Sequence, residues 1–357
     1  MTDPKNEKVV IIGGDISGLS VARTLMIEGY RDILILIREK RYRGDPGHPP
    51  SGLIRHFHPD APFRDTLNDG VSLLRDYREE NDGLFDFGTS LLLDHIDQRE
   101  HLETHPDGNF TWNDTKQDAV PDALRPKNGS NPFWFDCQGD GVGNERDLEH
   151  HMLEVLRESK QITVRNQSEV WDGHYERGRW VLYVSGSERI EANVIINASG
   201  IRANEIGERL GLTKRKYAII RRNLFYSTQS LIPEQYLFFL DRMHGNTFRS
   251  VNGGTIVSAC EKQPVKLEDA RPQPVSVSFL KNNTEPFYPE LPQINVQRAW
   301  SSRFARTSNR TPIIRRDPDR HSVIWVTGMN EFNLTLSFWI GQRVHQLLTE
   351  DAPSVTA

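Results

Sequence analysis

Residues 8–18 read KVVIIGGDISG, and this stretch decides the fold. Its first five residues form a largely β-branched run without polar alternation, which is typical of a strand buried in a parallel sheet. A glycine turn follows, and from Ile16 to Gly29 apolar residues recur every three or four positions, which predicts a helix. Residues 33–37 supply the next strand. Strand, turn, helix and strand together predict a βαβ unit with a right-handed crossover.

The glycine turn has the outline of a GxGxxG motif, which holds a pyrophosphate on backbone N–H groups at a helix N-terminus. Gly13 and Gly18 occupy the first and third glycine positions, but Asp15 stands at the middle one. Two like charges about 4 Å apart at an effective dielectric constant of 20 repel by roughly 4 kcal/mol. Asp15 therefore opposes a bound anion, unless its side chain turns outward as a helix N-cap.

Further periodic segments predict the remaining architecture, which we assign to the α/β class. Residues 104–144 are rich in Pro, Gly, Asn and Asp, so we expect irregular segments and short strands there. The helices are expected at 66–80, 145–160 and 334–348. The strands are expected near 161–165, 168–175, 179–184, 193–197, 217–227, 235–240, 254–260 and 322–327.

Composition narrows the classes of function. The chain has 357 residues, 44 basic against 49 acidic side chains and a net charge of -5. This balance carries no electrostatic footprint for nucleic acid or an anionic membrane, so we expect a small-molecule substrate. The two cysteines, Cys137 and Cys260, are too few for a disulfide framework, and we expect a cytoplasmic protein with both as core residues. We expect no metal site, because the adjacent His150 and His151 diverge by about 100° on a helix.

Four segments, in this order along the chain, resemble the D-amino-acid-oxidase-like family of FAD-dependent oxidoreductases, which includes glycine oxidase and monomeric sarcosine oxidase. They are VVIIGG at 9–14, SGLIRH at 51–56, NASG at 197–200 and Thr327-Gly328 before the last helix. The resemblance implies a Rossmann-like FAD-binding domain of the glutathione-reductase type, interleaved with an antiparallel-sheet substrate domain. We assign residues 1–83, 145–213 and 301–357 to the first domain, and 84–144 and 214–300 to the second.

The resemblance also implies a set of cofactor-binding residues at the glycine turn, the second strand and the segments near the flavin. These are Gly13, Gly14, Asp15, Ser17, Gly18, Arg38, Glu39, Ser51, Gly52, Val170, Ala198, Gly200, Gly328, Asn330, Glu331 and Asn333.

At the end of the second strand the family usually carries a glutamate that binds the adenosine ribose, and Ile37 takes that position here. Glu39 lies two residues later, on the same face of a continued strand, and could substitute if the register shifts. Basic residues cluster between 38 and 43. They fit either a phosphate-reading cluster of the NADP type or a solvated run of charge.

A third departure precedes the last helix, where the family's glycine-rich segment meets the flavin. Gly328 is retained, but Glu331 and Asn333 replace two further glycines. A side chain at either position must occupy space that the flavin needs or point away from it. With Asp15 and Ile37, four positions depart from the family's cofactor pattern. The sequence therefore supports two alternatives equally: FAD binding is retained, or it is weakened or lost.

The loop that contains Arg55, His56 and His58 is the best catalytic candidate, because the resemblance places its arginine and histidine beside the flavin. Arg55 suits the binding of a carboxylate or of negative charge on flavin, and a histidine titrates near neutral pH. Each histidine fits a hydrogen-bonded structural role equally well. Candidates for a substrate carboxylate clamp from the second domain are Arg242, His244, Arg249, Arg303 and Arg306.

The resemblance implies an FAD-dependent oxidoreductase that acts on the C–N bond of an amine or amino acid by hydride transfer to flavin. One alternative is a flavin-free descendant that uses the same cleft for non-redox chemistry or ligand binding. Another is a non-catalytic protein subunit of a flavoprotein complex.

Overall fold

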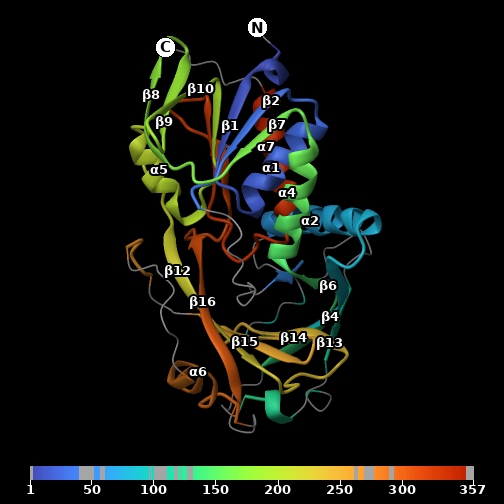
Figure 1. Ribbon diagram of the computed structural model, residues 1–357. Helices are drawn as coiled ribbons and strands as arrows, with labels where there is room; N and C mark the ends of the chain where they lie inside the picture. Colours follow the sequence, from blue (N-terminus) through green and yellow to red (C-terminus); the bar gives the residue numbers. More distant parts are fainter. Residues whose placement is uncertain are drawn as a thin grey trace.

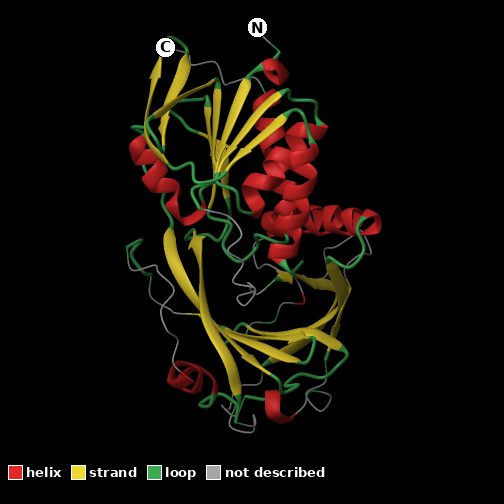
Figure 2. Cartoon of the chain, in the orientation of Figure 1, coloured by secondary structure: helices red, strands yellow, loops and turns green. Residues whose placement is uncertain are grey.

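The structure is a computed structural model. It describes residues 3–39, 52–56, 61–95, 97, 99, 111–115, 120, 122–126, 132–260, 264–268, 277–288 and 293–350. The described residues form two large sheets that lie end to end, and the helices flank mainly the sheet nearer the two termini (Figures 1 and 2). The mixed α/β class predicted from the sequence is confirmed.

The six-stranded sheet carries the predicted βαβ unit, because β1 pairs with β2 in parallel and α1 connects them. Its order is β17-β18-β11-β1-β2-β7, with only the edge strand β17 antiparallel to its neighbour. The bounds are β1 Lys8–Ile12, α1 Ile16–Ile27, β2 Asp32–Leu36, β7 Ile162–Arg165, β11 Val194–Asn197, β17 Ile313–Arg316 and β18 Val323–Thr327.

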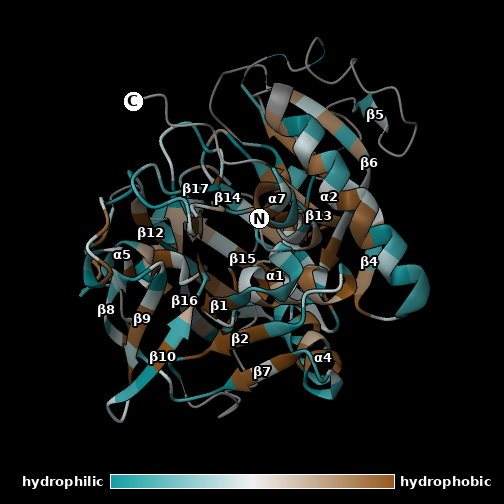
Figure 3. Ribbon diagram, turned by 90° about the horizontal axis from the view of Figure 1, so that it is seen from above, coloured by the Kyte–Doolittle hydropathy of each residue, from teal (hydrophilic) through white to brown (hydrophobic). Residues whose placement is uncertain are grey.

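This sheet is the middle of three layers, as the buried positions of β1 show. Val9 and Ile11 pack into the core shared with α1, α2, α4 and α7, whereas Val10 and Ile12 pack into the core shared with a small three-stranded sheet and α5. The bounds are α2 Ala61–Glu80, α4 Glu145–Glu158, β8 Val170–Glu176, β9 Arg179–Val184, β10 Glu188–Ala192, α5 Ala203–Arg209 and α7 Ser337–Thr349. In Figure 3, apolar residues concentrate on β2 and β7, and the outer strand β10 is mostly polar.

The second sheet has nine strands in the order β16-β12-β15-β14-β13-β4-β6-β3, with β5 paired to β6. It is antiparallel except for the parallel pair of β13 and β4. Its bounds are β3 Leu53–Ile54, β4 Phe85–Asp94, β5 Thr111–Asp114, β6 Phe133–Gly143, β12 Ala218–Ser227, β13 Tyr236–Asp241, β14 Asn246–Val251, β15 Gly254–Cys260 and β16 Val296–Arg306. A helix α6, Val277–Thr284, and single turns η1 Pro4–Asn6, η3 Asp122–Leu124 and η4 Gly200–Arg202 complete the described elements.

The expectation of short strands within residues 104–144 fits β5, which has 4 residues, but is wrong for β6, which has 11. Its glycines, which suggested turns, lie inside the sheet, where the register with β4 shifts between Gly88 and Thr89. Gly141 is needed there, since a Cβ would come within 2.8 Å of Asp86 O. The division of the chain into two domains stays a prediction, although β16 runs across the boundary placed at residue 300.

None of the helices in the described part of the chain has the length and apolar character needed to cross a membrane. Cys137 is buried with a free thiol, as expected for a core residue, and the side chain of Cys260 lies outside the described residues.

Candidate functional site

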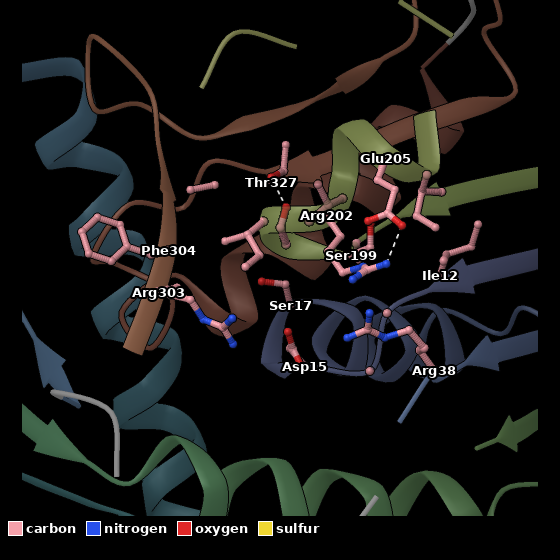
Figure 4. Close-up of a pocket in the computed structure, with 18 of the residues that line it drawn as sticks. Ile12, Asp15, Ser17, Arg38, Ser199, Arg202, Glu205, Arg303, Phe304 and Thr327 are labelled. Atoms are coloured by element: carbon pink, nitrogen blue, oxygen red, sulfur yellow. Dashed lines mark hydrogen bonds and ion pairs between the residues drawn. The ribbon is translucent and has the colours of Figure 1, made fainter. Parts of the chain in front are cut away.

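A cavity of about 1170 Å³ opens at the carboxyl ends of the parallel strands β1, β2, β11 and β18. Ligands of open α/β sheets bind at this edge. Twelve of the sixteen cofactor residues predicted from the resemblance line this cavity, several of which Figure 4 draws. They are Gly13, Gly14, Asp15, Ser17, Arg38, Glu39, Val170, Ala198, Gly200, Gly328, Asn330 and Asn333.

Two glycines of the turn after β1 allow close backbone packing. Gly13 has φ +120°, and a Cβ there would lie 2.1 Å from Ala198 O at the end of β11. Gly18 lies within α1, where a Cβ would come 2.2 Å from Gly13 O. Gly18 therefore does not line the cavity but holds α1 against the turn, which points the first N–H groups of α1 at the cavity.

The N-terminus of α1 faces carboxylates of its own chain. Asp15 stands at the N-cap position, but its side chain makes no capping hydrogen bond and instead lines the cavity (Figure 4). The first helical N–H, that of Ile16, donates to Glu149 Oε1 of α4 at 3.1 Å. Burial and the negative charge of Asp15 raise the pKa of Glu145, one turn earlier on α4, to about 7. The bound anion expected at this terminus therefore has to compete with Glu149 and approach Asp15.

The end of β2 lacks an acidic side chain facing the cavity at the family's position. Ile37 is buried at 2% exposure, and its Cδ1 lies only 2.5 Å from where a Cβ of Gly14 would be. Because β2 ends at Leu36, the assumption of a strand that continues to Glu39 is wrong. Glu39 still reaches the cavity, where its Oε1 accepts from Arg38 Nε at 2.8 Å. The basic residues from 40 to 43 lie outside the described residues.

The loop between β18 and α7 closes the opposite end of the cavity. Gly328 has φ +70°, and Asn330 adopts a left-handed φ of 57°. Asn330 ties this loop to β16, since its N–H donates to Ala305 O at 3.0 Å and its Oδ1 accepts from Thr307 N at 3.1 Å. The side chain of Asn330 is thus committed to the loop.

Glu331 is not among the residues that line the cavity and instead pairs with two arginines. Its Oε1 lies 2.6 Å from Arg222 Nη2, and its Oε2 lies 3.3 Å from Arg55 Nη2. Burial alone would raise the pKa of Glu331, but Arg222, Arg55 and Arg310 lower it to about 2. Glu331 is therefore ionised throughout the physiological range.

Arg55 is held on several sides. Its backbone N–H donates to Thr335 Oγ1 at 3.2 Å, and its guanidinium carbon lies 4.6 Å from the centre of the Phe332 ring. Burial lowers the pKa of this guanidinium, and Glu331 opposes the effect. Arg222 lies over Phe304, a residue of the cavity wall, at 5.5 Å. The arginine cluster thus adjoins the cavity at its Phe304 end.

His56 lies apart from the cavity lining. It is buried at 3% exposure, and both its N–H and its Nδ1 lie 3.0 Å from Asp140 Oδ1, whose partner oxygen accepts from Ser90 Oγ at 2.5 Å. Gly52 also lies outside the lining, at the edge of β6, where a Cβ would lie 2.1 Å from Gly143 O. Ser51 and His58 lie outside the described residues.

Of the clamp candidates from the second sheet, the structure brings Arg303 to the cavity. Arg242 pairs with Asp94 at 2.8 Å, and His244 pairs with Asp241 and stacks on Phe287, away from the cavity. The helical histidines also lie away from it. His150 is exposed and His151 contacts Tyr77, and the described residues contain no cluster of metal-ligating side chains.

The sequence prediction missed Glu145, Glu149 and Arg222. Glu145 and Glu149 lie four positions apart on a predicted helix and therefore share a face, which is a signal that the sequence contains. Also missed was a charged network at the cavity mouth, in which Glu205 bridges Arg202 and Arg209. These residues are spaced i, i+3 and i, i+4 over η4 and α5, but no helix was predicted there, so their spacing carried no signal.

Comparison with known proteins gives the family and the fold. The family model described as "DAO: FAD dependent oxidoreductase" matches residues 8–347. No curated protein sequence matches significantly. Among solved structures, glycine oxidase from Geobacillus kaustophilus matches with a TM-score of 0.75 at 17% identity, covering 98% of this chain and 96% of that one.

Two further structures match over similar lengths. L-proline dehydrogenase from P. horikoshii has a TM-score of 0.77 at 16% identity, covering 99% of this chain and 96% of that one. Iminodiacetate oxidase from Chelativorans sp. BNC1 has a TM-score of 0.74 at 18% identity, covering 98% and 97%. At these identities the structural matches establish the shared fold.

Proposed function

The chain belongs to the DAO family of FAD-dependent oxidoreductases, and from this premise we propose that it oxidises the C–N bond of a small amine or amino acid with FAD as cofactor. The observation that carries the proposal is the cavity at the carboxyl ends of the parallel strands, lined by twelve of the predicted cofactor residues. Relatives of the same fold that oxidise such compounds, glycine oxidase and iminodiacetate oxidase among them, support the substrate class.

The cavity fits FAD in size and in its backbone-lined walls. Its volume of about 1170 Å³ exceeds the roughly 300–1,000 Å³ of a usual small-molecule pocket. Gly13 and Gly328, which have no side chain to cover their backbone, are among the residues that line it. In our proposal the residues that hold FAD are Gly13, Gly14 and Ser17 at the pyrophosphate, Arg38, Glu39 and Val170 at the adenosine, and Gly328 and Asn333 at the flavin.

A carboxylate of the chain itself occupies one of the N–H groups that FAD would use. The Ile16 N–H that a pyrophosphate would use donates to Glu149, and Asp15 adds a negative charge beside it. Helix N-termini favour anions because their N–H groups are unsatisfied and the helix dipole is positive there. Here Glu149 already satisfies the first of them. Because Asp15 adds a like charge beside the same terminus, we expect FAD to bind more weakly than to a chain with glycine at position 15.

The chemistry that FAD supplies in this family is the acceptance of a hydride from the carbon of the C–N bond. The protein's part is to orient the substrate and exclude water at the Phe304 end of the cavity. Arg222, which lies over Phe304, and Arg55, which lies over Phe332, adjoin this end of the cavity, and the Glu331 carboxylate pairs with both. His56 positions this loop through Asp140 rather than facing the cavity.

The test is the visible absorbance spectrum of the purified protein, recorded before and after incubation with FAD and gel filtration. A retained flavin spectrum that bleaches when an amine or amino acid is added without oxygen supports the proposal. A protein that binds no flavin at FAD concentrations well above micromolar contradicts it.

The Glu149 contact favours a second candidate, a flavin-free relative that binds a small molecule in the same cavity. This candidate expects no flavin spectrum, together with a raised melting temperature in the presence of a cavity ligand. A non-catalytic role as a subunit of a flavoprotein complex is separated from both by co-purification of a stable hetero-oligomer.

A further inference from the structure

Glu331 lies in the loop before α7 and forms ion pairs with two arginines near the second sheet. Arg55 follows β3 and Arg222 lies on β12, so the two guanidinium groups reach the carboxylate from separate strands. Each oxygen of Glu331 has its own arginine, Oε1 with Arg222 at 2.6 Å and Oε2 with Arg55 at 3.3 Å. The two guanidinium groups thus form a fork that holds the Glu331 carboxylate.

Exposure shows on which side the fork opens. The side chains of Arg55 and Arg222 are 8% and 6% exposed, whereas that of Glu331 is 23% exposed. The arginines therefore form the floor and the carboxylate lies toward solvent, which is the arrangement of a bound anion above its binding site. Arg55 and Arg222 also rest on Phe332 and Phe304, and these rings limit the directions from which a second anion could approach.

The two positive charges of Arg55 and Arg222 require an anion between them. Two buried guanidinium groups without a counter-ion would be strongly destabilising, and removal of one partner of a buried ion pair leaves an uncompensated charge. Arg242 and Arg310 add further positive charge nearby, and Asp94 neutralises Arg242. The Glu331 carboxylate is thus the anion that completes the Arg55–Arg222 fork.

We propose that Glu331 is a built-in carboxylate that occupies the Arg55–Arg222 fork and so excludes small carboxylates from it, which makes Glu331 a specificity-determining residue. The substrate class that follows is an amine whose reacting carbon carries no free carboxylate group. This part of the inference rests on the proposed function. A substrate carboxylate would have to displace Glu331 from two charge-assisted contacts, whereas an uncharged group leaves them intact.

The experiment replaces the side chain and offers a carboxylate from solution. E331A is unfolded with urea in sodium acetate and in sodium chloride of equal ionic strength, with wild type in parallel. At an acetate concentration ten times its dissociation constant, the unfolding equilibrium constant of E331A falls about tenfold relative to chloride. Wild type shows no difference between the two salts.

E331Q is the matched control, because glutamine fills the same volume and leaves no room for acetate, so its unfolding is expected to be equal in both salts. A response of E331A that E331Q or wild type shares, or no response of folded E331A, overturns the proposal. If E331A folds only in acetate, the proposal is supported. If it folds in neither salt, E331A/R222L, which leaves one buried cation, takes its place, and the absence of an acetate response there overturns the proposal.

This experiment needs neither FAD nor turnover, so its failure is distinct from failure of the proposed function. Where turnover is measurable, a second arm compares an N-methylated amino acid with its methyl ester. In E331A the ratio of kcat/KM for the acid over the ester rises tenfold or more above that of wild type. An unchanged ratio overturns the assignment of substrate class.

Discussion

The backbone N–H of Ile16, the first residue of α1, donates a hydrogen bond to Glu149 Oε1 of α4 at 3.1 Å. This contact places a carboxylate of the chain itself at the helix terminus from which a dinucleotide's pyrophosphate would be held. Asp15 lines the cavity beside it. Affinity for the cofactor is therefore a balance between the helix N–H groups and two internal carboxylates.

Removal of these carboxylates is expected to strengthen FAD binding. In D15G the nearer charge disappears and the motif regains its middle glycine, and a charge repulsion of roughly 4 kcal/mol at 4 Å sets the upper limit of the gain at about three orders of magnitude. E149Q, which frees the Ile16 N–H from an ionised acceptor, should give a smaller gain of about tenfold. The measurement is a titration of each variant into FAD, followed by the quenching of flavin fluorescence.

E176Q, on the exposed strand β8, is the matched control for these substitutions. A D15G affinity for FAD equal to that of E176Q would refute the role of Asp15.

Glu145 makes stability depend on pH. Its pKa is raised by burial and by Asp15 to about 7 from an ordinary 4.5. Between these two values the folded protein keeps a proton that the unfolded chain loses, so the free energy of unfolding falls as pH rises from about 4.5 to 7, by about 3 kcal/mol at most. Urea unfolding of E145Q and wild type should give matching stabilities near pH 4.5 and a more stable E145Q at pH 7.5.

Two comparisons make this pH test specific. E154Q, on the exposed side of the same helix, should follow the wild-type curve at every pH. Glu331 affects the free energy of unfolding only below pH 4.5. Because its pKa is lowered to about 2, its stabilisation is lost as pH falls from about 4.5 toward 2. A constant difference between E145Q and wild type across pH 4.5–7.5 would contradict the assignment.

The βαβ unit could be predicted because every signal for it is local. The buried runs at 8–12 and 33–37 and the helical period between them depend on neighbours in the chain, and the structure has β1, α1 and β2 at these places. Strand β6 could not be predicted in the same way. Its glycines resemble turn signals in the sequence, and only the pairing with β4 shows that they serve close strand contacts and a register shift.

In the candidate site, too, residues with a local signal could be predicted and residues brought together by packing could not. Gly13, Ala198 and Gly328 could be placed because each ends a predicted strand, and the carboxyl ends of parallel strands meet at one edge. The substitution at Glu331 was visible in the sequence, but its partner Arg222 was not, since strand β12 reaches it only through the packing of the second sheet. Charge pairs between distant segments have no signature in the spacing of either segment.

Gly13 is expected to tolerate no side chain. G13A places a Cβ 2.1 Å from Ala198 O at a φ of +120°, so both the contact and the backbone conformation are unfavourable, and a loss of more than about 3 kcal/mol of unfolding free energy is expected. G29A is the control, because Gly29 has φ +85° with no atom within 4 Å of an added Cβ, and its loss should be near the 1–2 kcal/mol of a left-handed alanine. Equal losses in urea unfolding of the two variants would show that the contact with Ala198 is not limiting.

His56 is expected to act on stability and not on the reaction. H56A removes a side-chain partner of Asp140, a carboxylate that is 2% exposed, and should cost about 1–3 kcal/mol of unfolding free energy. H56N can still donate to Asp140 and should recover most of that loss. Because His56 does not line the cavity, both variants should bind cavity ligands within twofold of wild type. The decisive measurement is kcat of H56N. If this variant is as stable as wild type but loses a hundredfold in kcat, the expectation is wrong and His56 takes part in the reaction.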